Sequence, residues 1–592
     1  MEKRFHYTSL PDHHIRLLKL TKCSDVSGRI AFDFLPISLE TLNSAYTALS
    51  YSWGSDIKTD RIWHEDSYLD ITASAMAIVS AVSKQTNPPY IWIDALCIDQ
   101  CNMAEKNIQV RLMNKIYARA NKVVAWLPYT PERSQVTNFI DTLHGAITNL
   151  FRQKLPITFQ SLIASTGCQD HSSWFQFAKF LEDPWFNRVW IVQEMVVPNE
   201  INIICGRTMV PWKALADVLS IIQGNGLQRL LVPLVEGVEM NPPSGLEAMV
   251  RNYAIHTLFQ TKQPRLLSSL LIDCWKCGAT DGRDKLFALV GIASDAGDAE
   301  FVPDYDVPEA TVFERATARL LSRDPDSNRI LHAAGLGLRR QPSPLPSWVP
   351  VWTDPFLNTI FGNITTAGYC ASGDTSTSHQ PFYDQNNHTL TISGHLVDTI
   401  KTIADPFPSA VWHDTREGLQ SKAAAELAWI SQIRQIYPQN TYPETEHPFF
   451  PHVLAFSLIA NMIHPGIAAP QVYADYFDQF IKYKTWTSTA TVTEWNSHKY
   501  SAAQLFGASS YATAMSISQQ RPFFVSENLY CGLGVPGVQV GDRICVFQGF
   551  ITPFILRPQL TGVYSLVGEC YIYGLMNREG LSQGIEQDII LA

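Results

Sequence analysis

Short apolar runs alternate with helical segments along the first 215 residues, and no other feature of the chain limits its fold as strongly. Buried strands are predicted where the runs are compact: 47–51, 90–98, 122–127 and 201–205. Helices are predicted between and after them: 71–83, 103–120, 174–181 and 188–196. Such alternation favours an α/β fold with a parallel, doubly wound sheet, whose ligands bind beyond the carboxyl ends of the strands.

Three segments of this region place Trp and polar or acidic residues inside otherwise apolar stretches. They are Ala48–Gly54 (ALSYSWG), Ile91–Gln100 (IWIDALCIDQ) and Arg188–Glu194 (RVWIVQE). Polar groups that are buried without a partner cost free energy, so strands gain nothing from them unless they serve a site. Together the segments predict strand ends and a helix that converge on one polar pocket. The alternative is three core elements whose polar groups are satisfied locally.

In this order, the three segments resemble the fungal heterokaryon-incompatibility (HET) domain. Further resemblance lies in EK at 105–106, the run 109–127, DGRDKLFAL at 281–289, PDY at 303–305, PSWVP at 346–350 and the glycine-rich stretch 541–576. Two positions depart from the family pattern. Lys106 stands where Arg is usual, and Val351 stands where Asp commonly precedes the last Trp of the Pro-Ser-Trp motif. The resemblance implies a HET domain that is distantly similar to Toll/interleukin-receptor (TIR) domains.

The length of 592 residues predicts two or three domains, because single cores stop growing well below this size. We expect an N-terminal extension at 1–44, a doubly wound HET domain at 45–215, a mainly helical region at 216–390 and a C-terminal region at 391–592. The last region should end in a small β-rich barrel or sandwich, since short β-rich runs alternate there with Gly and Pro turns. Residues 370–387 predict a long exposed loop, and helices are expected at 418–437 and 452–463.

Composition narrows the classes of function. The net charge of −10 and the absence of a dense basic run argue against nucleic-acid binding. No apolar signal-peptide core follows the first residue, and no run approaches the roughly 18 apolar residues of a membrane span. The 11 cysteines are scattered singly, as reduced thiols are, rather than arranged as a disulfide framework. A cytoplasmic protein that does not bind membranes is expected, and its oligomeric state is left open.

Glu194 is the first candidate for a catalytic residue. Trp190 lies four residues earlier, so the two side chains share one face of the predicted helix. An aromatic neighbour desolvates a carboxylate and raises its pKa, which suits a general acid or base. Trp-x-x-x-Glu also resembles the catalytic helix of TIR domains that hydrolyse NAD. The alternative is a structural Glu paired with Arg188 or another cation.

The remaining candidates surround this carboxylate. On a regular strand Asp94 and Asp99 point to opposite faces, so Asp99 and Gln100, at the strand end, are preferred for the site. Asp94 is then expected to pair with backbone or Arg inside the fold. Trp53 and Gly54 would bring the backbone close to a ligand, with a tight turn around a packed Trp as the alternative. The expected catalytic pair is Glu194 and Asp99, and the expected substrate-binding set is Trp53, Gly54, Gln100, Arg188, Trp190 and Gln193.

Other matches to known motifs lack the neighbouring residues or elements that a metal or nucleotide site requires. Cys274 and Cys277 have no second pair nearby, and Cys97 and Cys101 have no His close in sequence, so no metal is predicted. The stretch 532–537 matches the dinucleotide-binding fingerprint as text, but no helix follows it. No cofactor is predicted.

Two functions from different classes remain open. The resemblance implies a role in nonself recognition and cell death, with TIR-like NAD cleavage as a candidate reaction and a nonself-recognition protein as partner. The alternative is a cofactor-independent cyclase of fungal secondary metabolism, such as a Diels–Alderase, that confines a hydrophobic terpenoid or polyketide in an aromatic pocket. The 15 Trp, 22 Tyr and 29 Phe could line such a pocket, although cores use the same residues. Whether the chain is an enzyme therefore stays open.

Overall fold

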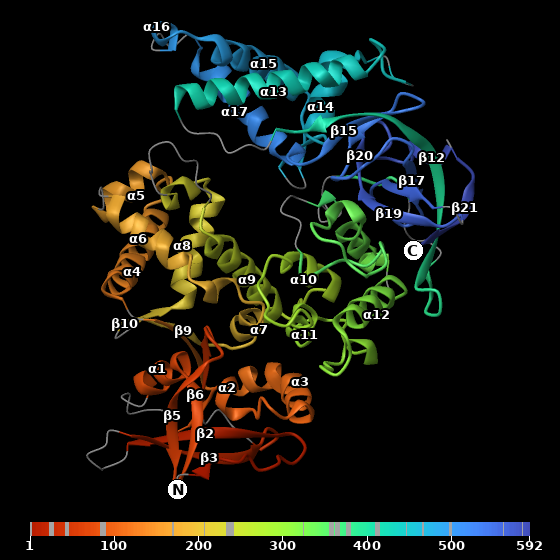
Figure 1. The fold of residues 1–592 in the computed structure, drawn as a ribbon. Helices are drawn as coiled ribbons and strands as arrows, with labels where there is room; N and C mark the ends of the chain where they lie inside the picture. Colours follow the sequence, from red (N-terminus) through yellow and green to blue (C-terminus); the bar gives the residue numbers. More distant parts are fainter. Residues whose placement is uncertain are drawn as a thin grey trace. The chain divides into compact units, whose positions relative to one another are not determined.

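The computed structural model divides into two compact units, one ending at Pro308 and one running from Glu309 to Ala592 (Figure 1). It describes residues 3–592 except 23–28, 42–45, 83–89, 129, 168–170, 206–207, 233–241, 324, 355–359, 362–367, 374–379, 409–414, 444, 446, 465–466, 496–499, 560–561 and 583. The helical region predicted at 216–390 is divided between the two units. In the part of the chain described, no helix is both long and apolar enough to cross a membrane.

The first unit is built on a mixed sheet with the strand order β1-β6-β5-β3-β2-β7-β4-β8-β9-β10. Its strands are β1 (Lys3–Arg4), β2 (His14–Lys22), β3 (Ile30–Ser38), β4 (Thr47–Tyr51), β5 (Lys58–His64), β6 (Ser67–Thr72), β7 (Ile91–Trp92), β8 (Lys122–Leu127), β9 (Ile201–Cys205) and β10 (Thr208–Pro211). The pairs β4–β7, β4–β8 and β8–β9 are parallel, which confirms a parallel-sheet α/β core. The predicted N-terminal extension adds the antiparallel hairpin β2–β3 to this sheet, so the sheet as a whole is mixed.

The strand predicted at 90–98 is wrong beyond Trp92. β7 ends at Trp92, and a short helix, α2 (Asp94–Cys97), follows it. Asp94 starts this helix, and its Oδ1 accepts the Ala95 N–H at 2.7 Å. Short apolar runs fit a buried helical turn as well as a buried strand, so the pattern alone did not separate the two. The turn changes the direction in which the Asp94 side chain points.

The other predicted helices of this unit form with shifted ends. α3 (Met103–Arg119) starts at an Asn102 cap whose side chain accepts the Glu105 N–H. α7 (Ile191–Val196) starts three residues later than predicted because Arg188 is extended and bridged to Gly278. The remaining helices are α1 (Ala73–Val82), α4 (Pro131–Arg152), α5 (Phe159–Thr166), α6 (His171–Leu181), α8 (Trp212–Gly224), α9 (Ser244–Gln260), α10 (Leu267–Asp273) and α11 (Asp284–Val290).

The second unit contains a closed ring of strands. The ring order is β12-β17-β18-β19-β21, and β21 pairs with β12 again. Its strands are β12 (Thr389–Pro406), β17 (Arg543–Phe547), β18 (Phe554–Pro558), β19 (Tyr564–Glu569) and β21 (Glu586–Leu591). β12 is long and curved (Figure 1), and it also pairs with β15 (Pro522–Ser526). Register shifts lie along β12, which pairs with four strands: β15, β17, β21 and β11 (Phe382–Asp384).

Helices complete the second unit. α13 (Arg416–Ile436), α15 (Val472–Thr489) and α17 (Ala502–Ala514) pack together, and the prediction of a helix at 418–437 is confirmed. The helix predicted at 452–463 is shorter, because α14 (Leu454–Leu458) gives way to the strand β13 (Met462–His464). In the predicted loop at 370–387, Ala371 and Ser372 are buried, and Phe382–Asp384 forms β11 against β12. Residues 374–379 of that loop lie outside the described residues.

Candidate functional site

Glu194 lies in a buried cluster to which three elements contribute. Ser50, on β4, donates its hydroxyl to Glu194 Oε2. Trp185, in the 3₁₀ turn before α7, donates its indole N–H to Ser50 Oγ at 2.8 Å. The Tyr117 hydroxyl, on α3, donates to the Leu49 carbonyl at 3.5 Å and lies near enough to Glu194 to lower its pKa. Ser50 and Glu194 are each 1% exposed, so the carboxyl group has protein rather than water as its surroundings.

A second carboxyl group, that of Asp94, joins the other two sequence segments. The Trp53 indole N–H donates to Asp94 Oδ2 at 2.9 Å. The Gln100 side chain donates to the backbone carbonyl of Asp94 at 3.0 Å. Trp53 and Gln100 therefore meet at Asp94, and the turn of α2 brings this carboxyl group to the cluster.

The positive charge of Arg188 acts on both carboxyl groups. Its Nη1 donates to the Tyr51 carbonyl, and its positive charge lowers the pKa of both Asp94 and Glu194. The backbone on either side of it is fixed by Gly278, whose N–H donates to Asn187 O at 2.5 Å and whose carbonyl accepts the Val189 N–H at 2.9 Å. The Arg188 guanidinium thus contacts the first segment at Tyr51 and acts electrostatically on Asp94 of the second.

Burial sets the proton affinity of the two acids. It raises the pKa of Glu194 to about 7, against the opposing effects of Arg188 and the Ser50 hydrogen bond. The nearby Asp94 carboxyl adds to the rise. Burial likewise raises the pKa of Asp94, and Arg188 is the main opposing influence. A carboxyl group with a pKa near neutrality can both donate and accept a proton at physiological pH.

Two buried side chains of the cluster have unpartnered atoms among the described residues. The Tyr51 hydroxyl lies within electrostatic range of Asp94, Arg188 and Glu194, and no hydrogen-bond partner contacts it. The Gln193 carbonyl oxygen is also without one. Buried polar atoms normally find partners, so these two are available to a ligand.

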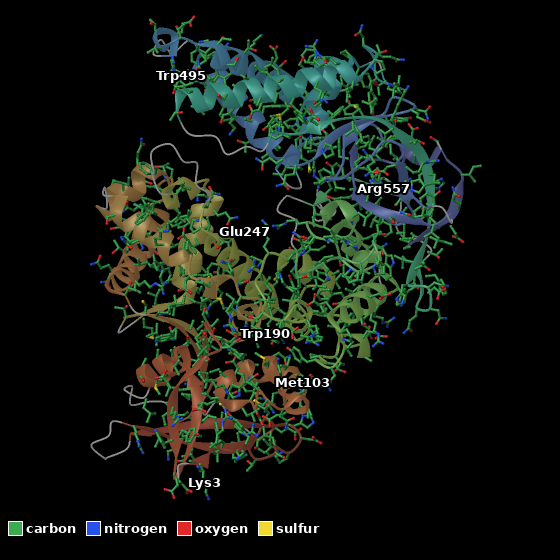
Figure 2. The ribbon with its side chains drawn as sticks, viewed as in Figure 1. Lys3, Met103, Trp190, Glu247, Trp495 and Arg557 are labelled. Atoms are coloured by element: carbon green, nitrogen blue, oxygen red, sulfur yellow. The ribbon has the colours of Figure 1, made fainter. Side chains whose placement is uncertain are left out.

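Asp99 and Trp190 have side-chain partners other than the Glu194 carboxyl group. Asp99 accepts the Cys101 N–H at 3.1 Å, and its own N–H donates to Glu105 Oε1 at 2.8 Å. Trp190, labelled in Figure 2, lies near enough to the Asp284 carboxyl group to lower its pKa. Their predicted roles, like those of the whole set, stay predictions.

Gly54 and Gln193 are held in tight surroundings. Gly54 has a φ of +69°, and a Cβ there would lie 2.7 Å from Ser74 Oγ, so this turn requires glycine. The Gln193 amide approaches Gly291, where a Cβ would lie 2.9 Å from its Nε2. The turn at Gly54 is exposed and Trp53 is half-buried, which makes this turn the part of the cluster nearest to solvent.

Sequence reasoning missed Ser50, Tyr117 and Trp185, which contact Glu194 or its partner. A polar Ser50 within the buried run 47–51 was a usable signal, because a strand interior rarely holds an unpartnered hydroxyl. No sequence signal connected Trp185 or Tyr117 to the site, since their approach depends on how α3 and the 3₁₀ turn pack.

We expect the melting temperature of the purified, reduced protein to be the same with and without a metal chelator or a reductant. No group of His, Cys, Asp or Glu that could hold a metal occurs among the described residues, and the described cysteines are free. Ligands that bind only the native state would make its stability sensitive to their removal. Differential scanning fluorimetry measures this, and a lower melting temperature in chelator would contradict it.

The residues of this cluster fall within a match to a known family. The family model for the heterokaryon incompatibility protein (HET) matches residues 46–194, from the start of β4 to Glu194. Residues 46–194 are therefore similar to the HET domain. A second family model, the Het-6 beta-barrel domain, matches residues 471–591. β12, which closes the ring of strands, precedes that match.

The chain is similar along its length to a curated relative. Heterokaryon incompatibility protein 6, OR allele, of Neurospora crassa is 25% identical over 680 aligned residues, which cover 99% of this chain and 98% of the relative. No solved structure matches the chain. The resemblance expected from the three sequence segments is confirmed.

Proposed function

We propose that this protein acts in heterokaryon incompatibility, with a nonself protein as its trigger, and that its HET domain causes cell death by hydrolysing NAD at Glu194. The observation that carries the proposal is the buried Glu194 carboxyl, whose pKa of about 7 fits it for proton transfer at neutral pH. The name of the Neurospora crassa relative, which is similar along the whole chain, supports the biological process.

The proposed reaction breaks the bond between nicotinamide and ribose. Positive charge develops on the ribose carbon as nicotinamide leaves, and a water molecule attacks that carbon and loses a proton. Carboxylates are the groups that stabilise such a cation and accept such a proton. Glu194 takes this role in its ionised form, and the unpartnered Tyr51 hydroxyl binds the substrate beside it. The products are nicotinamide and ADP-ribose.

Access to the cluster runs through the turn at Trp53 and Gly54. Glu194 is covered in this structure, whereas Gly54 is exposed. Opening the Trp53 to Asp94 hydrogen bond would uncover the two carboxyl groups. A trigger that moves this turn would therefore switch the activity on.

The test is expression of three forms in a fungal host, with viability, NAD and extracted metabolites measured together. The wild type and Glu182→Gln, which changes an exposed carboxylate on the same unit, should both lower NAD and stop growth. Glu194→Gln should do neither. Growth arrest by the wild type with NAD unchanged would contradict the proposal. A new cyclised metabolite with NAD unchanged would instead identify a cyclase.

A further inference from the structure

Cys274 and Cys277 place two free thiols in one buried turn at the end of α10. The Cys277 N–H donates to the Cys274 carbonyl at 2.9 Å, which closes a four-residue turn. Such a turn brings its first and last Cα atoms within about 7 Å. A disulfide bridges Cα atoms about 4.4–6.8 Å apart, so this turn can hold one with little movement. The two thiols also hydrogen-bond each other.

Two cationic side chains face this pair. Lys285, buried on α11, donates its Nζ to the Trp275 carbonyl at 2.8 Å and to the Cys277 carbonyl. Arg251, on α9, lies within electrostatic range of both thiols and donates to Asn252 Oδ1 at 3.2 Å. Neither cation forms an ion pair with a carboxylate in the described part of the chain.

The nearby carboxylates are engaged with other cations. Glu247, labelled in Figure 2, pairs with Lys276 at 3.3 Å, and Asp273 pairs with Arg265. The anion that best complements Arg251 and Lys285 is therefore a thiolate of the pair itself.

The two thiols have different pKa values, so Cys277 is the thiolate that attacks and Cys274 is the thiol that keeps its proton. The hydrogen bond from Cys274 lowers the pKa of Cys277 to about 6, with Arg251 and Lys285 adding to the effect against burial. The same hydrogen bond holds the pKa of Cys274 well above its usual range. Burial raises the pKa of Cys531, a buried thiol of the other unit, to about 12. Cys277 is thus the nucleophile, since only the thiolate attacks.

We propose that Cys274 and Cys277 form a redox-active dithiol, which a peroxide converts reversibly into an intramolecular disulfide. The Cys277 thiolate attacks one peroxide oxygen, so a sulfur–oxygen bond forms and the oxygen–oxygen bond breaks. The released hydroxide takes up a proton to give water and leaves a sulfenic acid on Cys277. The Cys274 sulfur then attacks Cys277, its proton leaves with the hydroxyl as a second water, and the disulfide forms. Two thiols are oxidised and one peroxide is reduced.

The cysteine pair lies next to the segment that carries Arg188, so its oxidation state can influence the cluster around Glu194. Gly278 follows Cys277 directly, and its backbone bonds to Asn187 and Val189 fix the segment that carries Arg188. A change of backbone angles in the turn therefore reaches Arg188 across one residue and one pair of hydrogen bonds.

The test treats the reduced, desalted full-length protein with hydrogen peroxide, alkylates the remaining thiols with N-ethylmaleimide and maps disulfides by mass spectrometry. Cys274 and Cys277 should become linked before any other pair, and dithiothreitol should restore both thiols. In Cys274→Ser, oxidation should stop at a sulfenic acid on Cys277, which dimedone traps. In Cys277→Ser, oxidation of Cys274 should be at least about 10-fold slower than that of Cys277, because burial still raises the pKa of the remaining thiol. Cys531→Ser is the matched buried control and should leave the linkage unchanged.

A variant that keeps both cysteines tests the proposal even if the serine variants misfold. Lys285→Gln retains N–H donors for the two carbonyls but removes the positive charge, so peroxide should oxidise the pair more slowly. Cys101 is exposed and shows when peroxide has oxidised accessible thiols. If N-ethylmaleimide still alkylates both Cys274 and Cys277 at that point, the proposal is overturned. Linkage of the folded pair at a rate no faster than in the urea-unfolded chain would overturn it as well.

Discussion

Replacing Glu194 with Gln should reduce NAD hydrolysis by about 100-fold or more, because general acid–base groups typically contribute that much to a rate. The amide has the size of the carboxyl group and can still accept the Ser50 hydroxyl through its oxygen, so the cluster should keep its shape. The measurement is nicotinamide release by purified protein at neutral pH. Glu182→Gln is the control and should retain the wild-type rate. Equal rates in the wild type and Glu194→Gln would remove Glu194 from the mechanism.

The same substitution should change how stability depends on pH. The pKa of Glu194 is raised from 4.5 to about 7 in the folded chain, so the folded state holds this proton more tightly than the unfolded state. The stability it contributes is fully present below about pH 4.5 and is lost as pH rises through about 7, a loss of about 3 kcal/mol in the free energy of unfolding.

Urea unfolding at about pH 5 and about pH 8 compares the wild type with Glu194→Gln. The variant should lose less stability between the two values, because the Gln amide does not titrate. Asp94 also has a raised pKa and gives a dependence of the same sign in both proteins, so the difference between them isolates Glu194. Identical pH dependence would show that Glu194 keeps an ordinary pKa in the fold.

Replacing Arg188 with Met should destabilise the first unit by about 1–3 kcal/mol, the usual cost of leaving a buried polar group unsatisfied, because the Tyr51 carbonyl loses its guanidinium donor. Two buried carboxyl groups depend on this guanidinium, and without it the pKa of each should rise further. Adding Asp94→Asn removes one of them, so the double variant should recover part of the lost stability. Urea unfolding at neutral pH measures both.

The control for Arg188 is an exposed ion pair on the same unit. Lys179 lies 2.8 Å from Glu182, with 49% and 40% of the side chains exposed. Lys179→Met should change the free energy of unfolding by less than about 1 kcal/mol, because water screens such pairs. If Arg188→Met costs no more than Lys179→Met, the cluster does not depend on its cation.

The sheet core was predictable because its strands are continuous apolar runs. β4, β8 and β9 occupy the residue ranges expected, and α3 starts at Met103 as its apolar spacing indicated. The segment after Trp92 was not predictable, since a short apolar run does not distinguish a strand from a helical turn.

The helical turn α2, found in place of the predicted strand, also changes which aspartate lies near the cluster. Alternation along a strand separates Asp94 from Asp99 and favours the residue at the strand end. The helical turn of α2 instead brings Asp94 to Trp53 and Arg188. Glu194 was predictable from its position among apolar residues. Its partners Tyr117 and Trp185 were not, because they arrive from separate elements through tertiary packing.

The long strand β12 makes the second unit slow to assemble. Its partner in β15 is more than a hundred residues later, as the register pair Pro406 with Pro522 shows, and β21 comes later still. At synthesis rates of about 5–20 residues per second, β12 leaves the ribosome on the order of 10 s before its partners exist. During that interval its unpaired edges can associate with other chains, so the yield of folded protein should depend on chaperones that cover them.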